Sequence, residues 1–122
     1  MRSTRTPSRT SANRPLTEAE LLQHVRDAAR WLGLLEYHTR DSRGSTPGFP
    51  DLVLAGPGGL IFRELKSETG RPTWEQREWL DQLRRAGADA GYWYPHQWPE
   101  PIMTDLRILA GQKPEPKGSD HV

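Results

Sequence analysis

The sequence predicts a single small α/β domain with the element order helix, three strands, helix, strand. Three observations predict it. Two stretches repeat apolar residues at three- and four-residue steps between a capping residue and a glycine, as amphipathic helices do. A glycine-rich break, Gly56 to Gly59, separates two short apolar runs, as in a β-hairpin. An aromatic run then ends at Pro95, where a strand would stop.

The first helix is expected to run from a Thr17 cap to about Leu32, with Gly33 ending it. Its apolar face is formed by Leu21, Leu22, Val25, Ala28, Ala29 and Leu32. Leu34 to His38 suits a short strand, and the turn-forming residues 40–47 suit a loop. The helix therefore leads into the edge of a small sheet.

The hairpin is expected to pair Asp51 to Ala55 with Leu60 to Lys66. A second helix begins at Thr73 and ends at Gly87. Its inward residues are expected to be Trp79, Leu80, Leu83 and Ala86. Ala90 to Tyr94 is expected to form a buried strand, and residues 102–110 a short final helix.

Charge divides the 122-residue chain into three parts. Residues 1–15 carry four arginines and no acid, a net charge of +4, and their composition predicts a disordered basic arm. Residues 111–122 carry no net charge, and their composition predicts a disordered tail. Because the whole chain has a net charge of +1 and the arm carries +4, the domain at 16–110 carries −3. Two interpretations of the arm stay open: a solubilising leader, or a contact to nucleic-acid phosphates through counterion release.

Composition also excludes several kinds of site. The chain has no cysteine, which removes disulfides, thiolate metal sites and a cysteine nucleophile, and fits a reducing cytoplasm. No apolar run approaches the length of a membrane span, and the N-terminus lacks the core of a signal peptide. Gly56 to Gly59 lacks the lysine and the following Ser/Thr of a P-loop. We expect a soluble, intracellular protein.

Three charged residues meet at one end of the predicted hairpin. If the break closes symmetrically, Ala55 faces Leu60, Val53 faces Phe62 and Asp51 faces Glu64. Because side chains alternate along a strand, Lys66 then shares the face of Glu64. Two opposed carboxylates repel each other, and burial would raise that cost.

A divalent cation would remove this conflict. Mg²⁺ prefers one or two protein carboxylates together with waters and phosphate oxygens, which Asp51 and Glu64 can offer. Lys66 could stabilise the attacking water or the charge that develops on phosphate. The arrangement indicates phosphodiester cleavage, although each fragment alone also occurs on solvated strands.

These residues resemble a known nuclease motif. Pro50-Asp51 followed by Glu64-Leu65-Lys66 is similar to the PD-(D/E)XK motif of restriction-endonuclease-like nucleases. Residues 37–56, 60–83 and 86–95 resemble the small phage and bacterial members of the VRR-NUC group, and the similarity covers about residues 17–98. The resemblance implies a metal-dependent enzyme with an αβββαβ core around a mixed sheet flanked by helices.

The resemblance also implies residue roles. Asp51 and Glu64 match the metal-binding carboxylates, Leu65 would add its backbone carbonyl, and Lys66 matches the catalytic lysine. A further helix acid is common in the family. Glu18 continues the apolar stripe of the first helix, whereas Glu20 falls on a polar side; we choose Glu18, which could also be there only to suit the helix dipole.

Two other groups near the motif have competing interpretations. Gln76 fits a capping box with Thr73, but it also extends the inward stripe toward the predicted site, where the family places a glutamine. His38, Arg40 and Arg43 suit either a solvated turn or phosphate binding. His38 is a weaker candidate for metal ligand or general base.

The function expected from these arguments is a Mg²⁺-dependent endonuclease that hydrolyses DNA, with Mn²⁺ as a substitute. The resemblance extends the expectation to branched or four-way DNA, to a homodimer, and to the cytoplasm of a bacterium or phage-infected cell. The competing class is a non-catalytic nucleic-acid or protein interaction module that keeps the fold. Metal-dependent cleavage separates the two.

Overall fold

The computed structural model describes residues 14–39 and 46–113. The elements, in chain order, are α2 (Glu18–Trp31), β1 (Leu35–His38), β2 (Leu52–Gly56), β3 (Gly59–Leu65), α3 (Trp74–Arg85), β4 (Asp89–Trp93), the 3₁₀ turn η1 (Pro95–Gln97) and α4 (Ile102–Leu109). This order confirms the predicted α/β fold. The arm at 1–13, the loop at 40–45 and the tail at 114–122 lie outside the described residues, so their predicted disorder stays a prediction.

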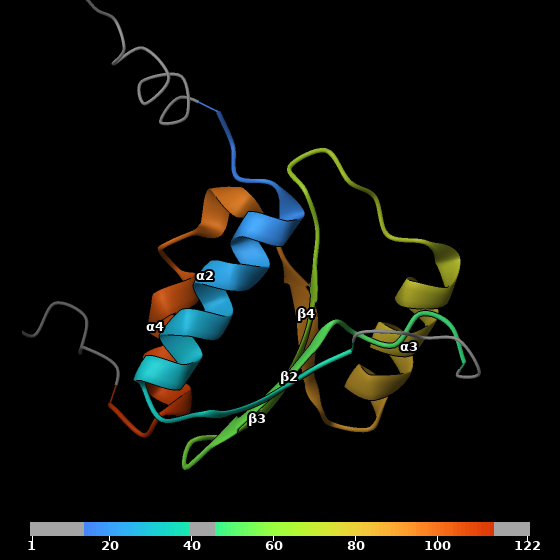
Figure 1. Cartoon of the computed structure of the whole chain (residues 1–122). Helices are drawn as coiled ribbons and strands as arrows, with labels where there is room; N and C mark the ends of the chain where they lie inside the picture. The colour runs from blue at the N-terminus through green and yellow to red at the C-terminus, as the bar shows by residue number, and fades with distance from the viewer. Residues whose placement is uncertain (1–13, 40–45, 114–122) are drawn as a thin grey trace, which may run out of the picture.

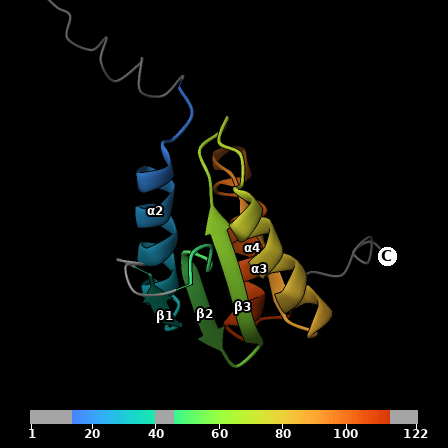
Figure 2. The same ribbon diagram turned by 90° about the vertical axis from the view of Figure 1, so that its right-hand side faces the viewer.

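One four-stranded sheet in the order β1-β2-β3-β4 forms the middle layer. The first three strands are antiparallel, and β4 is parallel to β3, so the sheet is mixed. Helices α2 and α4 pack against one face, and α3 lies on the other (Figure 1). In Figure 2, α3 lies at the β3 side of the sheet, away from β1, in agreement with its contacts to β4.

The main core lies between the sheet and the α2–α4 layer. Alternate strand residues enter it, because side chains alternate between the two faces of a strand. The buried core residues are Leu21, Val25, Ala29, Leu34, Leu52, Leu54, Ile61, Leu65, Trp93, Ile102, Leu106 and Leu109. The opposite face is smaller: Phe49 packs edge-to-face on both Phe62 and Trp79, with ring centroids 6.2 and 5.0 Å away.

Local signals placed both long helices correctly. Thr17 and Thr73 each cap a helix and form a complete capping box with the residue three positions later. Gly33 and Gly87 follow the helices with φ of 78° and 91°, a conformation that glycine adopts without strain.

Three details differ from the expectation. The hairpin closes through Pro57-Gly58 alone, since Gly56 pairs with Gly59, so the connection has two residues and not four. Asp51 and Lys66 lie just outside the ends of β2 and β3. β4 is an edge strand in which Ala90 and Trp93 are buried and Asp89 is exposed, so the expected buried strand exists but is buried only in part. Across the described residues, no helix is long and apolar enough to cross a membrane.

Candidate active site

The predicted charged residues meet at one end of the sheet. There β2 begins and β3 ends, because the two strands run antiparallel. Helices α2 and α3 contribute Glu18 and Gln76, both from their first turns. The N-termini of both helices therefore lie at the site. The partial positive charge at a helix N-terminus favours negatively charged groups such as these carboxylates.

Asp51 is fixed from two sides. The pairs Ala55–Leu60 and Val53–Phe62 confirm the predicted register. Asp51 lies one residue before Leu52, whose pair with Arg63 is the last of the ladder at this end of the hairpin. Its Oδ2 accepts a hydrogen bond of 2.9 Å from the Leu65 N–H. Its carbonyl accepts one of 2.9 Å from the Thr39 N–H. The carboxylate is thus tied to the end of β3, beside Glu64.

Glu64 is the most constrained charged residue of the site. Its side chain is almost fully buried, with 2% of the residue exposed. Oε2 accepts a hydrogen bond of 2.8 Å from the Gln76 amide, whereas Oε1 is buried without a hydrogen-bond partner among the described residues. Burial, and next the charge of Asp51, raises the pKa of Glu64 to about 8, against the opposing effect of Lys66.

Lys66 completes the cluster. Its Nζ lies 3.5 Å from Glu64 Oε2, and the residue is only 8% exposed. Its backbone N–H donates to the Trp93 carbonyl over 3.0 Å, which holds the residue beside the end of β4. The ammonium group is therefore kept next to the carboxylates.

Gln76 combines both interpretations of the sequence. Its Oε1 accepts from the Thr73 N–H over 2.9 Å, which closes the capping box. Its Nε2 at the same time donates to Glu64 over 2.8 Å. The cap orients the amide, and the amide orients the carboxylate.

The choice between the two helix acids has a clear geometric answer. Glu18 lines a cavity of ≈ 310 Å³ together with His38, Asp51, Leu65, Ala19 and Leu22. Partial burial, and then Asp51, raises its pKa. Glu20 instead completes the Thr17 capping box and forms an ion pair of 2.9 Å with Arg14. Only Glu18 is available to the cluster.

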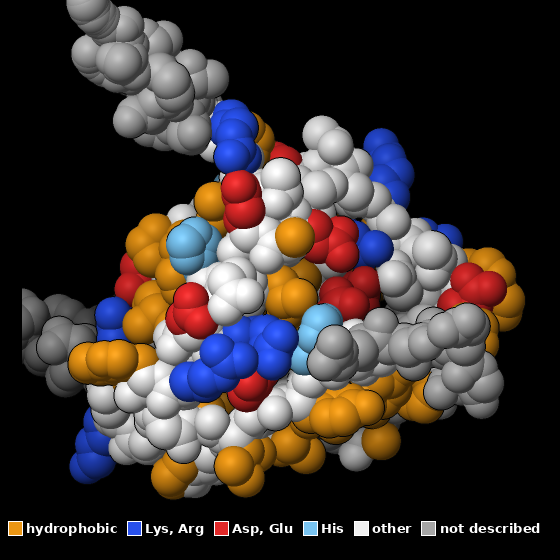
Figure 3. Space-filling model, viewed as in Figure 1, with side chains coloured by type: hydrophobic (Ala, Val, Ile, Leu, Met, Phe, Trp, Pro, Cys, Tyr) orange, Lys and Arg blue, Asp and Glu red, His pale blue; other side chains and the backbone are white. Residues whose placement is uncertain are grey.

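This part of the surface is visible to the right of α2 in the space-filling view. Figure 3 shows acidic side chains there with a basic and a histidine side chain close by. The cavity that Glu18, His38 and Asp51 line lies between α2, the end of β1 and the end of β3. The cluster therefore opens to solvent on the α2 side, while Glu64 is enclosed on the α3 side.

The residues present fit a divalent cation. Within the described ranges no three His, Asp or Glu side chains form a ready metal cage. Mg²⁺ does not need one, because it uses one or two carboxylates and keeps waters or phosphate oxygens in its other positions. Glu64, which lies near Asp51, has one unpartnered oxygen, Oε1, and such an oxygen could coordinate a cation.

Comparison with known families settles the relationship. The model of the VRR-NUC domain matches residues 2–95, most of the chain. The chain belongs to the VRR-NUC family. Membership makes it a nuclease-type protein, as the resemblance had implied. The matched range contains the whole cluster from Glu18 to Gln76.

Solved structures of VRR-NUC domains share the fold. One, described as a VRR_NUC domain protein, has a TM-score of 0.59 at 18% identity, over 83% of this chain and 93% of that one. Another, described as a VRR_NUC domain, has a TM-score of 0.56 at 22% identity, over 80% and 98%. No match was found among proteins of curated function.

Two of the predicted phosphate-binding residues of this VRR-NUC chain, Arg40 and Arg43, lie outside the described residues. Sequence reasoning also passed over the end of β4. Tyr92 is paired with Glu64 across the parallel ladder; burial raises the pKa of Tyr92, and the nearby Glu64 carboxylate acts in the same direction. The alternation of Tyr92, Tyr94 and His96 along the chain is the signal that could have drawn attention to this strand.

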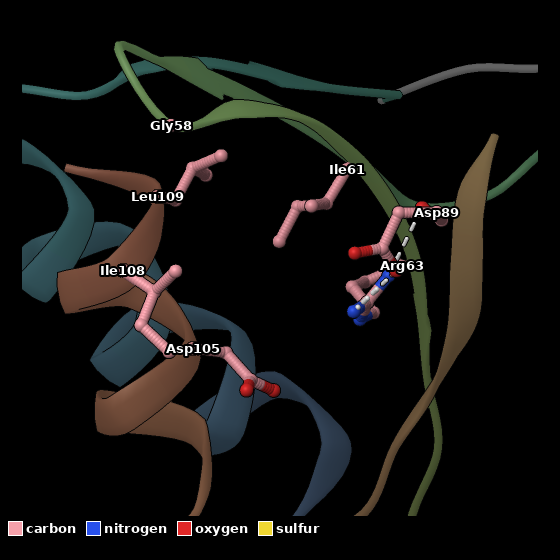
Figure 4. Close-up of a pocket in the computed structure, with 7 residues that line it drawn as sticks. All are labelled: Gly58, Ile61, Arg63, Asp89, Asp105, Ile108 and Leu109. Carbon is pink, nitrogen blue, oxygen red and sulfur yellow. Dashed lines mark hydrogen bonds and ion pairs between the residues drawn. The ribbon is translucent and has the colours of Figure 1, made fainter. Parts of the chain in front are cut away.

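A second cavity, of ≈ 230 Å³, lies away from the cluster on the α4 side of the sheet (Figure 4). Arg63 lines it and is held by Asp89, through a 2.9 Å ion pair and a 3.1 Å bond to the carbonyl. The guanidinium also lies 5.1 Å from the centre of the Trp93 ring. Asp105 lines the cavity too, and burial raises its pKa. The bonded charges here suit a structural role.

Proposed function

We propose that this VRR-NUC protein is a Mg²⁺-dependent endonuclease that hydrolyses phosphodiester bonds of DNA, with Mn²⁺ as a substitute metal. The observation that carries the proposal is Glu64: a buried carboxylate with one unpartnered oxygen, placed beside Asp51 and Lys66. An isolated buried carboxylate is costly, so the arrangement makes physical sense when positive charge arrives from outside the chain.

Asp51 and Glu64 would hold the metal, and the Leu65 carbonyl is the third candidate ligand. A bound Mg²⁺ supplies the positive charge that polarises the phosphate. The chain itself supplies orientation: the Leu65 N–H fixes Asp51, and Gln76 fixes Glu64. The two donor groups are themselves held in place, the Leu65 N–H by the strand backbone and the Gln76 amide by the capping box. The two carboxylates are therefore oriented before a ligand binds.

Lys66 would stabilise negative charge on the reacting phosphate. Its ammonium group is enclosed, which strengthens its electrostatic effect relative to an exposed lysine. Glu18 at the cavity rim, with its raised pKa, is suited to hold or release a proton of a nearby water. His38, in the same cavity, would contact the phosphate backbone of the substrate.

The proposal extends to branched or four-way DNA and to a homodimer, since cutting two strands of a branched substrate calls for two active sites. The exposed apolar side chains Leu35 and Tyr37 on the edge strand β1 support association with a second copy. Sedimentation of the purified protein tests the dimer directly. If β1 forms the interface, Tyr37→Glu should shift the protein toward the monomer. A variant that sediments as a dimer, like the parent, would show that this surface is not the interface.

The competing function is a nucleic-acid or protein interaction module without activity. The observation that favours this alternative is the Lys66–Glu64 ion pair, which can neutralise part of the buried charge without a metal. The deciding experiment incubates purified protein with linear, single-stranded, flap and four-way DNA, and with RNA, in Mg²⁺, Mn²⁺ or EDTA. An endonuclease gives metal-dependent internal products that Glu64→Gln abolishes. Binding without products, in every metal, would establish the module.

A further inference from the structure

A row of three aromatic side chains leads outward from the candidate active site. Tyr92 lies beside Glu64 in the parallel ladder, and Tyr94 and His96 follow at two-residue intervals. The Tyr92 and Tyr94 rings are 6.4 Å apart and tilted by 46°, and the Tyr94 and His96 rings are 5.9 Å apart and stacked at 19°. The row therefore begins at the catalytic cluster and ends at the surface.

His96, the last ring of the row, is held unusually firmly for a surface side chain. Its Nδ1 lies 2.9 and 3.0 Å from the two oxygens of Glu68, and its backbone N–H donates to the same carboxylate over 3.3 Å. Glu68 follows Lys66 by two residues, so the loop after β3 fixes this ring. Tyr94 covers one face of the imidazole.

The backbone under the row is also fixed. The Tyr94 N–H donates to the Gln97 side chain over 2.8 Å, and the Gln97 N–H donates back to the Tyr94 carbonyl over 2.9 Å. Pro95 between the two rings is buried. The position of the His96 ring is thus set by both of the chain segments that meet there.

Despite these restraints, 64% of the His96 side chain is exposed. An aromatic ring that is oriented in advance and open on its outer side loses little conformational entropy when a planar ligand stacks on it. Nucleobases are such ligands, and they stack on aromatic rings once they are unpaired. A duplex offers none, because its bases are already stacked.

We propose that His96 is a stacking platform for one unpaired base of the substrate, two ring spacings outward from Tyr92 and the candidate active site. This rests on the proposed nuclease function and adds a substrate class to it: DNA with an unpaired nucleotide in the stretch that flanks the cleavage site. Tyr94 supports the platform and Glu68 positions it. Neither is a catalytic residue.

The test measures DNA binding by fluorescence anisotropy with Ca²⁺ in place of Mg²⁺. Three probes of one sequence are compared: a fully paired duplex, the duplex with a short thymine flap, and the same flap made of abasic nucleotides. His96→Ala should weaken binding of the thymine flap about 5- to 150-fold, the range expected for the loss of one stacked base. Binding of the paired and abasic probes should change less than about twofold.

His96→Trp separates stacking from charge. It keeps an aromatic face and removes the imidazole nitrogens, so it should bind the thymine flap within about threefold of the parent. Affinity as weak as that of His96→Ala, together with equal losses on the abasic flap, would mean a phosphate contact and would overturn the platform. Glu68→Gln, which keeps one hydrogen bond to the ring, should fall between parent and His96→Ala.

Melting curves of each variant confirm that the fold is intact, and an unchanged thymine-flap affinity in a folded His96→Ala protein would overturn the platform by itself. The nuclease proposal fails separately. A parent protein that cleaves none of the probes in Mg²⁺ or Mn²⁺ counts against catalysis, whereas the Ca²⁺ binding series alone decides the role of His96.

Discussion

Strand β3 buries two charged residues in succession, and their surroundings differ completely. Arg63 points to the α4 side, where Asp89, two backbone carbonyls and the Trp93 ring engage its guanidinium. Glu64 points to the α3 side, where one oxygen bonds to Gln76 and the other has no bond among the described residues. Arg63 is thus fully partnered, as a structural charge would be, whereas Glu64 keeps one oxygen free, as the proposed ligand site needs.

The largest expected effect lies on the Glu64 side. Lys66→Ala should lower the cleavage rate about 100- to 1000-fold, the usual loss when one group that stabilises transition-state charge is removed. Folding and metal affinity should stay near those of the parent, because the lysine is not a ligand. Cleavage rate, circular dichroism and calorimetric Mg²⁺ titration measure the three properties, with Lys113→Ala as the exposed-lysine control. Near-parental cleavage would remove Lys66 from the mechanism.

The Arg63 side should respond in the opposite way. Arg63→Met should lower the free energy of unfolding by about 2–3 kcal/mol, because the Phe62 and Asp89 carbonyls and the Asp89 carboxylate lose their donor. Urea denaturation measures this loss. Cleavage by the folded fraction should be unchanged. Arg85→Ala, which breaks only an exposed ion pair with Asp81, should cost about 0.5 kcal/mol. A cleavage defect in folded Arg63→Met would break the proposed separation of roles.

Amide substitutions test the shared cation. Glu64→Gln and Asp51→Asn should leave metal-free stability equal or higher, since each removes the repulsion that arises once both carboxylates are charged. Both should lose the stabilisation that Mg²⁺ gives the parent, about 2.7 kcal/mol at 100 times the dissociation constant. Thermal melting with EDTA and with saturating Mg²⁺ measures both effects, and the exposed Glu78→Gln serves as control. Equal Mg²⁺ stabilisation of both amide variants would place the metal elsewhere.

The most gradual expected effect is a pH dependence of metal-free stability. The pKa of Glu64 is about 8 in the folded protein, above the ordinary glutamate value of 4.5. The folded state therefore holds a proton that the unfolded state has released, so this contribution is complete below about pH 4.5 and is lost as pH rises to about 8.

Denaturation in EDTA across this range should show parent stability falling relative to Glu64→Gln, by up to about 1 kcal/mol per pH unit. Glu18, with its raised pKa, adds a smaller effect of the same sign. Parallel pH profiles of parent and variant would show that Glu64 is already charged in the folded, metal-free protein.

The sequence by itself determined the elements and much of the candidate site. Thr17, Thr73 and the glycines that follow each helix act through local backbone geometry, so α2 and α3 were predictable within one or two residues. The hairpin register followed from strand alternation and a short turn, which placed Asp51 near Glu64. These features depend on residues close together in the chain, whose geometry is restricted by sterics and hydrogen bonding.

Only the tertiary structure decided the partners of the charged groups. Gln76 reaches Glu64 because α3 packs over β3 and β4, and Glu18 reaches the Asp51 cavity because α2 covers the opposite face. The sequence shows only that Arg63 and Glu64 are adjacent charged residues in one strand. It does not show that the first is fully hydrogen-bonded and the second is not. Whether a buried charge is bonded or left with a free oxygen depends on distant segments, here Asp89 and Trp93 on one face and Gln76 on the other, that folding brings together.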